Sequence, residues 1–423
     1  MVGAMKALWL VVLVSCWVVA APKRTVLHAA RAVLPESGKV ISPAWLSIEN
    51  HRIASLSSTQ PEGEVTELGE VTLVPGFIDA HSHLLYVEAA TADAMVGEAT
   101  SLDETDRALR AVMLGKQALR AGFTTVRDLG NSGRSGDVGL RRAIAAGWVE
   151  GPRVLASTRA LAPPMGQFYR LAPQHLALAE QEYAVVRTPE QATAAVVDAL
   201  AEGADCIKVI VDAGRNREVD AATLAAIVTR AHQAKVKVAA HATTSEAAQR
   251  AVAAGVDSIE HGYELNDATL AQMAKKNIAL VPTDYPIAFY EAFSANEPPE
   301  AQAAARAQFA VFRATSKRRL QRAVKAKVPI VYGSDAYMKT ALGDRGREMQ
   351  WVFEAYAEAG MSSLEILRAL TSTAARQLGI DGASLAAGER ADIVALEGDP
   401  TKDVKSLSRV KAVFKNGERV SND

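Results

Sequence analysis

The hydrophobic and polar positions divide the chain into regions of different periodicity. From Val26 to about Leu73, short apolar stretches are separated by turn residues, which predicts β-strands. The C-terminal segments ADIVALEGDP and VKAVFKNGERV alternate in the same way and are broken by Gly-Asp-Pro and Asn-Gly turns. We therefore expect both chain ends to form one small β-sandwich domain, covering residues 22–73 and 382–423.

The central region alternates alanine-rich amphipathic stretches with short β-branched runs, a pattern typical of repeated β/α units around a parallel sheet. Helices are expected to end at Gly122, Gly203 and Gly255, because glycine adopts the left-handed conformation that ends a helix. Eight strands are expected near 74–80, 124–129, 153–160, 206–212, 236–241, 257–261, 278–283 and 329–334. This predicts an α/β fold with a closed (β/α)8 TIM barrel over residues 74–381. An open doubly wound sheet is the alternative, but no GxGxxG or P-loop follows the first strand.

The N-terminal residues have the pattern of a targeting segment. Lys6 precedes an apolar run from Ala7 to Val19, which suits a signal-peptide core and is shorter than the roughly 20 residues that span a bilayer. We therefore expect residues 1–21 to be a signal peptide and the protein to be exported, to the periplasm or outside the cell. The segment LVSC also fits a lipoprotein cleavage box, which would anchor the protein through Cys16 instead.

Composition narrows the kinds of partner and of metal site. The chain of 423 residues is 49% hydrophobic and 22% charged, as in ordinary globular proteins, and its formal charge of −1 argues against a nucleic-acid partner. A small-molecule partner is expected instead. The two cysteines, Cys16 and Cys206, are too few for a thiolate zinc cluster, and Cys206 is expected to be a buried filler below Lys208. Metal chemistry must therefore use imidazoles and carboxylates.

Unusual polar residues fall at the ends of the expected barrel strands. They are His81 and His83 in the first strand, Lys208 in the fourth, His241 in the fifth, His261 in the sixth and Asp335 in the eighth. Residues i and i+2 of a strand share a face, so the first two imidazoles can converge. Each residue alone has an ordinary explanation, although a lysine in an apolar strand is costly to bury unpaired. Together, at the end of a barrel where active sites are built, they predict a metal site.

These residues and their surroundings resemble the amidohydrolase superfamily, in its binuclear subgroup. The motifs are VPGFIDAHSHL, IKV, HATT, IEHG, GSDA and GASLAAGERADIVALEGDP, which together cover most of the chain. The chain is similar to the imidazolonepropionase-like and prolidase-like branch, which includes dipeptidases and ochratoxin-hydrolysing amidohydrolases. The resemblance implies that His81, His83 and Asp335 hold one divalent ion and His241 and His261 a second. Lys208, carboxylated by CO2, would bridge them, zinc is the expected metal, and a homo-oligomer is implied.

The resemblance also implies an amide hydrolase. A hydroxide that bridges both ions would attack the carbonyl, and Asp335 would carry the proton to the leaving amine. The expected substrates are dipeptides or N-acyl amino acids, including ochratoxin-type amides, from which a C-terminal amino acid is removed. Two departures argue against dedicated Xaa-Pro activity: Thr243 and Thr244 stand where an aromatic residue is often found, and LAPPMGQFYR replaces a glycine- and histidine-rich turn.

Substrate contacts are expected in the loops, including the long segment 163–187. A substrate carboxylate needs arginine or tyrosine partners, and the candidates are Tyr169, Arg170, Tyr285, Tyr337 and Arg347. Apolar candidates for a side-chain pocket are Met165, Phe168, Phe289 and Tyr290. Three alternatives stay open: a mononuclear imidazolone or cyclic-amidine hydrolase or deaminase, a lactonase or phosphotriesterase, and a non-catalytic exported binding module.

Overall fold

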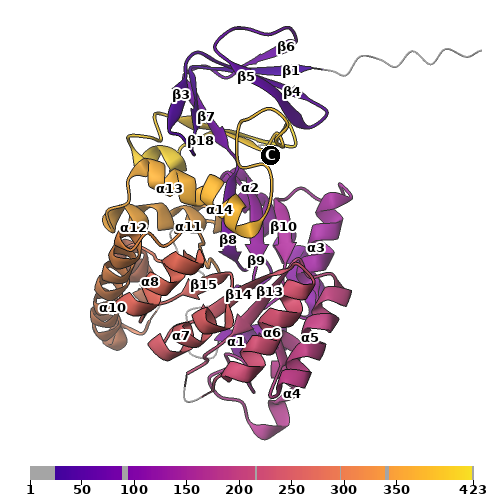
Figure 1. The fold of residues 1–423 in the computed structure, drawn as a ribbon, viewed down its shortest axis with the longest axis vertical. Coiled ribbons are helices and arrows are strands. Elements are labelled where there is room, and N and C mark those ends of the chain that lie inside the picture. The colour runs from indigo at the N-terminus through magenta and orange to yellow at the C-terminus, as the bar shows by residue number, and fades with distance from the viewer. Residues whose placement is uncertain (1–23, 88–93, 215–216, 296, 339–342, 422–423) are drawn as a thin grey trace, which may run out of the picture.

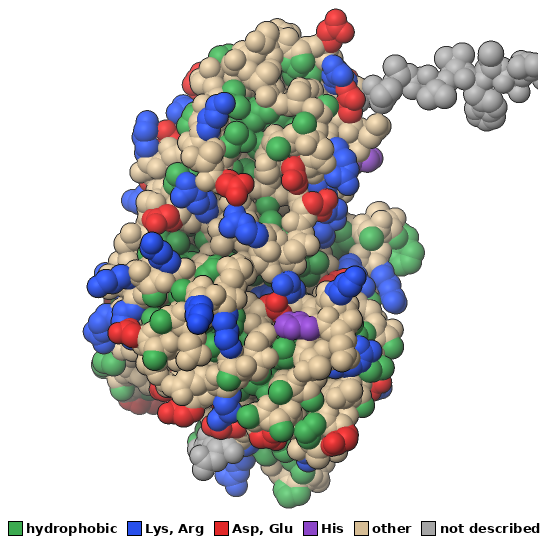
Figure 2. Space-filling model, in the orientation of Figure 1, with side chains coloured by type: hydrophobic (Ala, Val, Ile, Leu, Met, Phe, Trp, Pro, Cys, Tyr) green, Lys and Arg blue, Asp and Glu red, His purple; other side chains and the backbone are tan. Residues whose placement is uncertain are grey.

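The computed structural model describes residues 24–87, 94–214, 217–295, 297–338 and 343–421. A β domain forms one end of the molecule and a larger α/β barrel the other (Figure 1). The expected signal peptide, with Cys16, lies outside the described residues. None of the described helices combines the length and the hydrophobicity needed to cross a bilayer. Basic and acidic side chains intermingle on the face shown in Figure 2, as the near-zero net charge leads one to expect.

The β domain is a sandwich of two sheets, as predicted. One sheet has the order β5-β4-β1-β6 and the other β19-β18-β17-β7-β2-β3. Their bounds are β1 Thr25–Ala29, β2 Arg31–Leu34, β3 Lys39–Ile41, β4 Ala44–Glu49, β5 Arg52–Ser57, β6 Glu64–Glu67, β7 Val71–Pro75, β17 Ile393–Glu397, β18 Val410–Lys415 and β19 Glu418–Arg419. Side chains of both sheets, such as Leu46 and Ile393, share one apolar core. The two chain ends join where β17 pairs antiparallel with β7.

The barrel strands are parallel and lie where the sequence predicts them. They are β8 Phe77–Ser82, β9 Phe123–Asp128, β10 Arg153–Ala156, β11 Ala160–Ala162, β13 Cys206–Ile210, β14 Lys237–Ala242, β15 Ser258–His261 and β16 Ala279–Val281, with β12 Tyr183–Val185 beside β11. The expected third strand is divided into β10 and β11, because Thr158 between them has a left-handed backbone, φ +59°.

The barrel strands form two arcs, one from β8 to β10 and the other from β11 to β16. Backbone hydrogen bonds join these two arcs to one another. On one side, the Asp205 amide at the start of β13 donates to the Ala156 carbonyl at 2.7 Å. On the other side, segment 329–335 bonds to β16 through Leu280 and to β8 through the Ala80 amide, which donates to the Tyr332 carbonyl at 2.9 Å. This segment takes the place of the eighth strand but lacks regular strand pairing.

Helices surround the barrel and cover its apolar strands (Figure 1). They are α1 Ala94–Ser101, α2 Glu104–Arg120, α3 Gly136–Ala145, α4 Ala177–Glu182, α5 Pro189–Glu202, α6 Ala221–Gln233, α7 Ser245–Ala254, α8 Asp267–Lys276, α9 Ile287–Ser294, α10 Pro299–Lys325, α11 Arg345–Gln350, α12 Val352–Glu358, α13 Ser363–Leu370 and α14 Ser372–Leu378. Two 3-10 turns complete the set, η1 Pro173–His175 and η2 Val404–Ser408. The predicted left-handed glycines are confirmed, with φ of +99° at Gly122, +109° at Gly203 and +85° at Gly255.

Candidate metal centre

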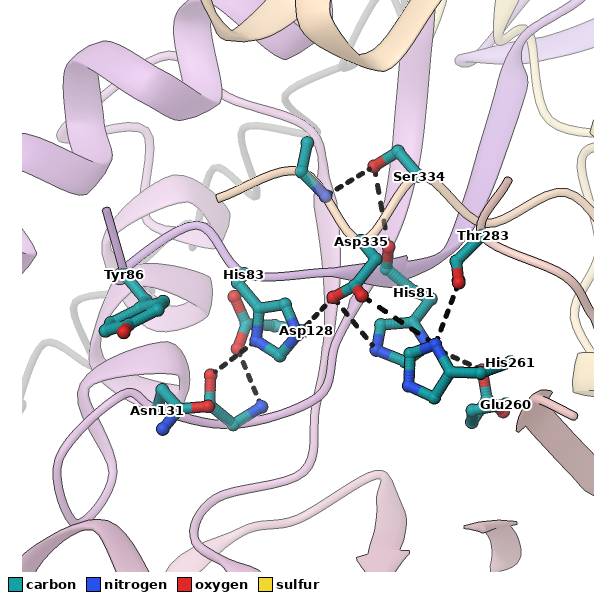
Figure 3. A network of polar contacts seen from close by, with 12 residues as sticks. His81, His83, Tyr86, Asp128, Asn131, Glu260, His261, Thr283, Ser334 and Asp335 are labelled. Atoms are coloured by element: carbon teal, nitrogen blue, oxygen red, sulfur yellow. Dashed lines mark hydrogen bonds and ion pairs between the residues drawn. The ribbon is translucent and has the colours of Figure 1, made fainter. Parts of the chain in front are cut away.

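The polar side chains at the strand ends meet at the C-terminal end of the barrel. His83 Nε2 lies 3.0 Å and His81 Nε2 3.4 Å from the same oxygen, Asp335 Oδ1 (Figure 3). Lys208 reaches the group from β13, with its Nζ 3.4 Å from His81 Nε2. Strands β8 and β13 and the irregular segment 329–335, which are far apart in the sequence, therefore bring two imidazoles, a carboxylate and an amine into contact.

Two further imidazoles complete the cluster. The ring centroids of His241, on β14, and His261, at the end of β15, are 4.6 Å apart, and those of His261 and His81 are 5.0 Å apart. One ligand atom from each of His81, His261 and Asp335 lies within 4.8 Å of the other two. The structure thus brings together all six residues for which the sequence predicts metal ligation.

Left-handed backbone turns direct several of these side chains. His261, Thr283 and Asp335, at the ends of three successive barrel strands, have φ of +68°, +56° and +52°. Non-glycine residues rarely adopt this conformation, and it costs roughly 1–3 kcal/mol per residue. The surrounding fold therefore stabilises a strained backbone at the mouth of the barrel.

A buried carboxylate orients His81 from behind. Glu260 accepts a hydrogen bond from His81 Nδ1 at 2.7 Å, and it also accepts from Arg127 Nη2 at 2.9 Å and from Ser258 Oγ at 2.5 Å. Glu260 and Arg127 are fully buried, so their opposite charges compensate one another in the barrel interior. With Nδ1 occupied as a donor, His81 Nε2 keeps its lone pair toward the cluster.

The same arrangement holds for two other imidazoles. His83 Nδ1 donates to the Gly130 carbonyl at 2.9 Å. The Thr283 hydroxyl donates to the Pro282 carbonyl, so it accepts from His261 Nδ1, 2.8 Å away. In both rings Nδ1 is thus engaged, so Nε2 is the nitrogen that faces the cluster, where His83 Nε2 lies 3.0 Å from Asp335 Oδ1.

The hydrogen bond and charge of Asp335 outweigh burial at His83 and raise its pKa. Burial keeps the other three imidazoles of the cluster uncharged. It lowers the pKa of His241 to about 3, assisted by the Lys208 cation. Burial likewise holds the pKa values of His81 and His261 well below their ordinary value. The pKa of Lys208 falls to about 8, mainly through burial, so part of the amine is unprotonated near that pH. A neutral amine is the form that reacts with CO2.

A cavity of about 260 Å³ opens onto the cluster. Besides the six polar residues, it is lined by Tyr86, Met95, Leu129, Asn131, Ala160, Gln167, Ile210, Tyr263 and Tyr337. A second cavity of about 300 Å³ shares Asp335, Tyr263 and Tyr337 with the first and is largely aromatic. Among the residues predicted to contact the substrate, Tyr337 lines both cavities, and Tyr285 and Tyr290 line the second.

Several other predicted substrate contacts lie elsewhere, and those predictions are corrected. Tyr169, 67% exposed, and Arg170 lie at the surface, while Phe168 is buried against Tyr183. Met165 and Gly166 have a left-handed backbone, with φ of +70° and +53°, and reverse the chain. The next residue, Gln167, therefore faces the cavity.

Two more candidates from the sequence support the site only indirectly. Phe289 stacks on Tyr285 with ring centroids 3.9 Å apart, so it lies behind the second cavity. The Arg347 guanidinium lies over the Trp351 ring, 4.8 Å from its centroid, and lines neither cavity.

Sequence reasoning missed the residues that position the cluster. Glu260 and Arg127 bear charges within the expected barrel strands, as Lys208 does, and every residue of their strands β15 and β9 is buried. Asn131 and Gln167 line the first cavity and are linked through the Tyr183 hydroxyl, at 3.1 and 3.3 Å. They lie in loops, where the sequence pattern does not show which side chain faces the site.

Known proteins resemble this chain over most of its length. Residues 72–420 match the amidohydrolase family. The chain belongs to the amidohydrolase family. Ochratoxinase of Aspergillus niger is 26% identical over 92% of this chain and 85% of its own length. An uncharacterized protein of Mycobacterium tuberculosis is 27% identical over 85% of this chain and 88% of its own.

Solved structures of other amidohydrolases are similar over nearly the whole chain. A Xaa-Pro dipeptidase with methionine bound in its active site superposes with a TM-score of 0.80 at 26% identity, covering 94% of this chain and 99% of that one. A prolidase complexed with N-methylphosphonate-L-proline superposes with a TM-score of 0.82 at 27% identity, covering 95% and 100%. This amidohydrolase is therefore an enzyme that acts on amide bonds.

Proposed function

We propose that the enzyme is a metal-dependent amide hydrolase that removes a C-terminal amino acid from dipeptides or N-acyl amino acids, including ochratoxin-type amides. The observation that carries this proposal is the convergence of four histidines, one aspartate and one lysine on a single cavity at the barrel mouth. The names of the relatives support the substrate class, since they include an ochratoxinase and a Xaa-Pro dipeptidase.

The residues of the cluster fit divalent metal ions. His81 and His261, with lowered pKa values and engaged Nδ1 atoms, present neutral Nε2 donors, and imidazole with carboxylate is a donor set that suits zinc. His81, His83 and Asp335 would hold one ion and His241 and His261 a second, with carboxylated Lys208 between them. Carboxylation of Lys208 would replace a buried cation by an anion, whose charge two divalent ions would neutralise. When bound, the ions lower the pKa of water and polarise the scissile carbonyl.

The protein's own groups handle the proton and hold the site in place. Asp335 borders the cavity and contacts two imidazoles, so its carboxylate is placed to accept the proton of the attacking water and deliver it to the leaving nitrogen. Glu260 and Arg127 fix the His81 ring behind it. These contacts support a site whose geometry is set before the substrate binds.

Dedicated Xaa-Pro activity is not part of the proposal. Thr243 and Thr244 are used structurally: their amides and the Thr243 hydroxyl donate to the buried Asp212, and Thr244 caps the first turn of α7. The 163–187 loop contributes a neutral glutamine to the cavity in place of histidine.

An activity screen tests the proposed function. The enzyme, loaded with zinc in bicarbonate buffer, is assayed against dipeptides, N-acyl amino acids, lactones and organophosphate esters. We expect release of the C-terminal amino acid from the first two classes. Hydrolysis confined to lactones or organophosphates would overturn the proposal in favour of esterase chemistry at the same site.

We also propose that the enzyme is exported by its N-terminal segment and forms a homo-oligomer. Cell fractionation with N-terminal sequencing tests export, because cleavage near residue 21 or lipidation at Cys16 gives different mature ends. Light scattering after size exclusion tests the oligomer. A cytosolic protein with an intact leader would contradict export. A monomer would contradict the homo-oligomer.

A further inference from the structure

The aromatic cavity beside the candidate metal centre is walled by α9 and α10, the elements inserted after β16. Its side chains include Tyr285, Tyr290, Phe293, Phe309 and Phe312. The rings pack edge to face or stacked: Tyr290 and Phe309 stack at 5.0 Å, and Phe293 meets Phe309 edge-on at 6.1 Å. They form a continuous aromatic wall beside the reacting groups.

Part of this wall is incompletely buried. Phe293, Phe309 and Phe312 are only half-buried, so they expose ring surface at the cavity. Covering this apolar surface with an apolar group stabilises a complex, and contacts between aromatic rings add to that stabilisation. Apolar cavities of about 150 Å³ hold a benzene molecule, so a cavity of about 300 Å³ has room for a phenyl, phenol or indole group.

The position of Asp335 relates this cavity to the scissile bond. Asp335, Tyr263 and Tyr337 border both the metal-centre cavity and the aromatic cavity. In the proposed reaction, Asp335 protonates the leaving nitrogen. A substrate group that passes Asp335 into the aromatic cavity is therefore attached to that nitrogen rather than to the acyl carbon.

We propose that the aromatic cavity binds the side chain of the amino acid that is released, and that Phe309 and Phe312 determine the preference for C-terminal phenylalanine, tyrosine or tryptophan. The inference rests on the proposed amide hydrolysis. In that reaction the C–N bond breaks, the oxygen of water goes to the acyl carbon, and a proton goes to the nitrogen of the departing amino acid.

Paired substrates and a matched pair of variants test the proposal. N-acetyl-L-phenylalanine is compared with N-acetyl-L-alanine for the leaving side, and N-benzoyl-L-alanine with N-acetyl-L-alanine for the acyl side. Phe309→Ala enlarges the cavity, whereas Val311→Ala, on the same helix and 70% exposed, leaves it unchanged. Thermal unfolding and metal content are measured for each variant to confirm a folded, loaded enzyme.

We expect the zinc-loaded enzyme to prefer N-acetyl-phenylalanine over N-acetyl-alanine by about tenfold or more in kcat/KM. Phe309→Ala should reduce this preference about tenfold, while Val311→Ala should keep both the preference and the rate of N-acetyl-alanine hydrolysis. Equal rates for the two substrates, an equal loss of both rates in Phe309→Ala, or a response confined to the benzoyl series would overturn the inference.

A binding measurement separates this inference from the proposed function. Saturation-transfer NMR of the metal-free protein with L-phenylalanine should show contact at the ring protons, which Phe309→Ala removes and Val311→Ala keeps. If none of the amides is hydrolysed, the proposed function fails whatever the NMR result. If amides are hydrolysed but the ring protons show no contact, the aromatic cavity has been misassigned.

Discussion

Asp335 is the residue on which the proposed chemistry depends, since it contacts two imidazoles and borders both cavities. Asp335→Asn keeps the shape of the side chain but cannot accept the proton. We expect kcat on N-acyl amino acids to fall by about 10²–10⁴-fold while substantial metal stays bound. Steady-state kinetics and elemental analysis of the same preparation check this. Near wild-type activity in the variant would remove Asp335 from the proton-transfer role.

Glu260 is expected to act through His81 rather than on the substrate. Glu260→Gln removes the charge that accepts from both His81 and Arg127, and it leaves the guanidinium buried without its partner. Losses of this kind lower metal affinity by about 10–100-fold. Competition with a chromophoric chelator measures the change, with Glu36→Gln, at a mostly exposed side chain, as the control. Equal metal affinity in the two variants would show that Glu260 does not support the centre.

The buried Glu348 carboxyl makes the free energy of unfolding depend on pH. Burial raises the pKa of Glu348 from 4.5 to about 7, against the opposing effect of Arg345. A raised folded-state pKa adds stability that is present below pH 4.5 and is lost as the pH rises through 7. Glu348→Gln does not titrate, so the free energy of unfolding of the wild type, relative to this variant, should fall by about 2 kcal/mol from pH 5.5 to 8. Urea denaturation of both proteins, after a chelator has removed any metal, measures this difference in free energy of unfolding. A difference that does not change with pH would contradict the prediction.

The six cluster residues could be predicted because they lie at or just beyond the ends of expected barrel strands. His81, His83, Lys208, His241 and His261 follow from strand ends and parity, because parallel barrel strands all end at the same mouth. Loop side chains do not follow such a rule. The left-handed turn at Met165 decides that a glutamine faces the cavity and that Tyr169 points to solvent.

At the level of elements, the helix ends offer a clean test of backbone conformation. Gly255 ends α7 with φ +85° and has no atom within 4 Å of an added Cβ, so Gly255→Ala introduces backbone strain without a clash. Gly139 lies within α3, also with open space, but in helical conformation. We expect Gly255→Ala to destabilise the enzyme by about 1 kcal/mol and Gly139→Ala to stabilise it by about 0.5–1 kcal/mol. Changes of the same sign in urea denaturation would contradict this.

Strands and helix ends could be predicted where the residues within them determine their structure. Apolar periodicity and left-handed glycines predict the barrel strands and the ends of α5 and α7, and the structure agrees. The break between β10 and β11 and the irregular segment 329–335 depend on contacts across the barrel, which periodicity does not report. The aromatic wall of α9 and α10 depends likewise on which helix faces turn toward β16.

At the scale of the whole molecule, the fold joins a β domain made from both chain ends to a barrel that carries the candidate metal site. Alternation at both ends predicts one β domain, but the pairing of β17 with β7 that closes it is a long-range register. The near-neutral charge argues against a nucleic-acid partner, and two cysteines leave imidazoles and carboxylates as the groups for metal chemistry. The barrel then brings this site to one mouth, beside the aromatic cavity.

Metal stoichiometry tests the central claim most directly. The enzyme is produced with zinc and bicarbonate, freed of loosely bound metal by gel filtration, and analysed by elemental mass spectrometry against protein concentration from amino-acid analysis. The arrangement of His81, His83, Lys208, His241, His261 and Asp335 predicts two ions per chain, falling to one or fewer in Lys208→Ala. One ion per wild-type chain, unchanged by that substitution, would contradict the binuclear centre.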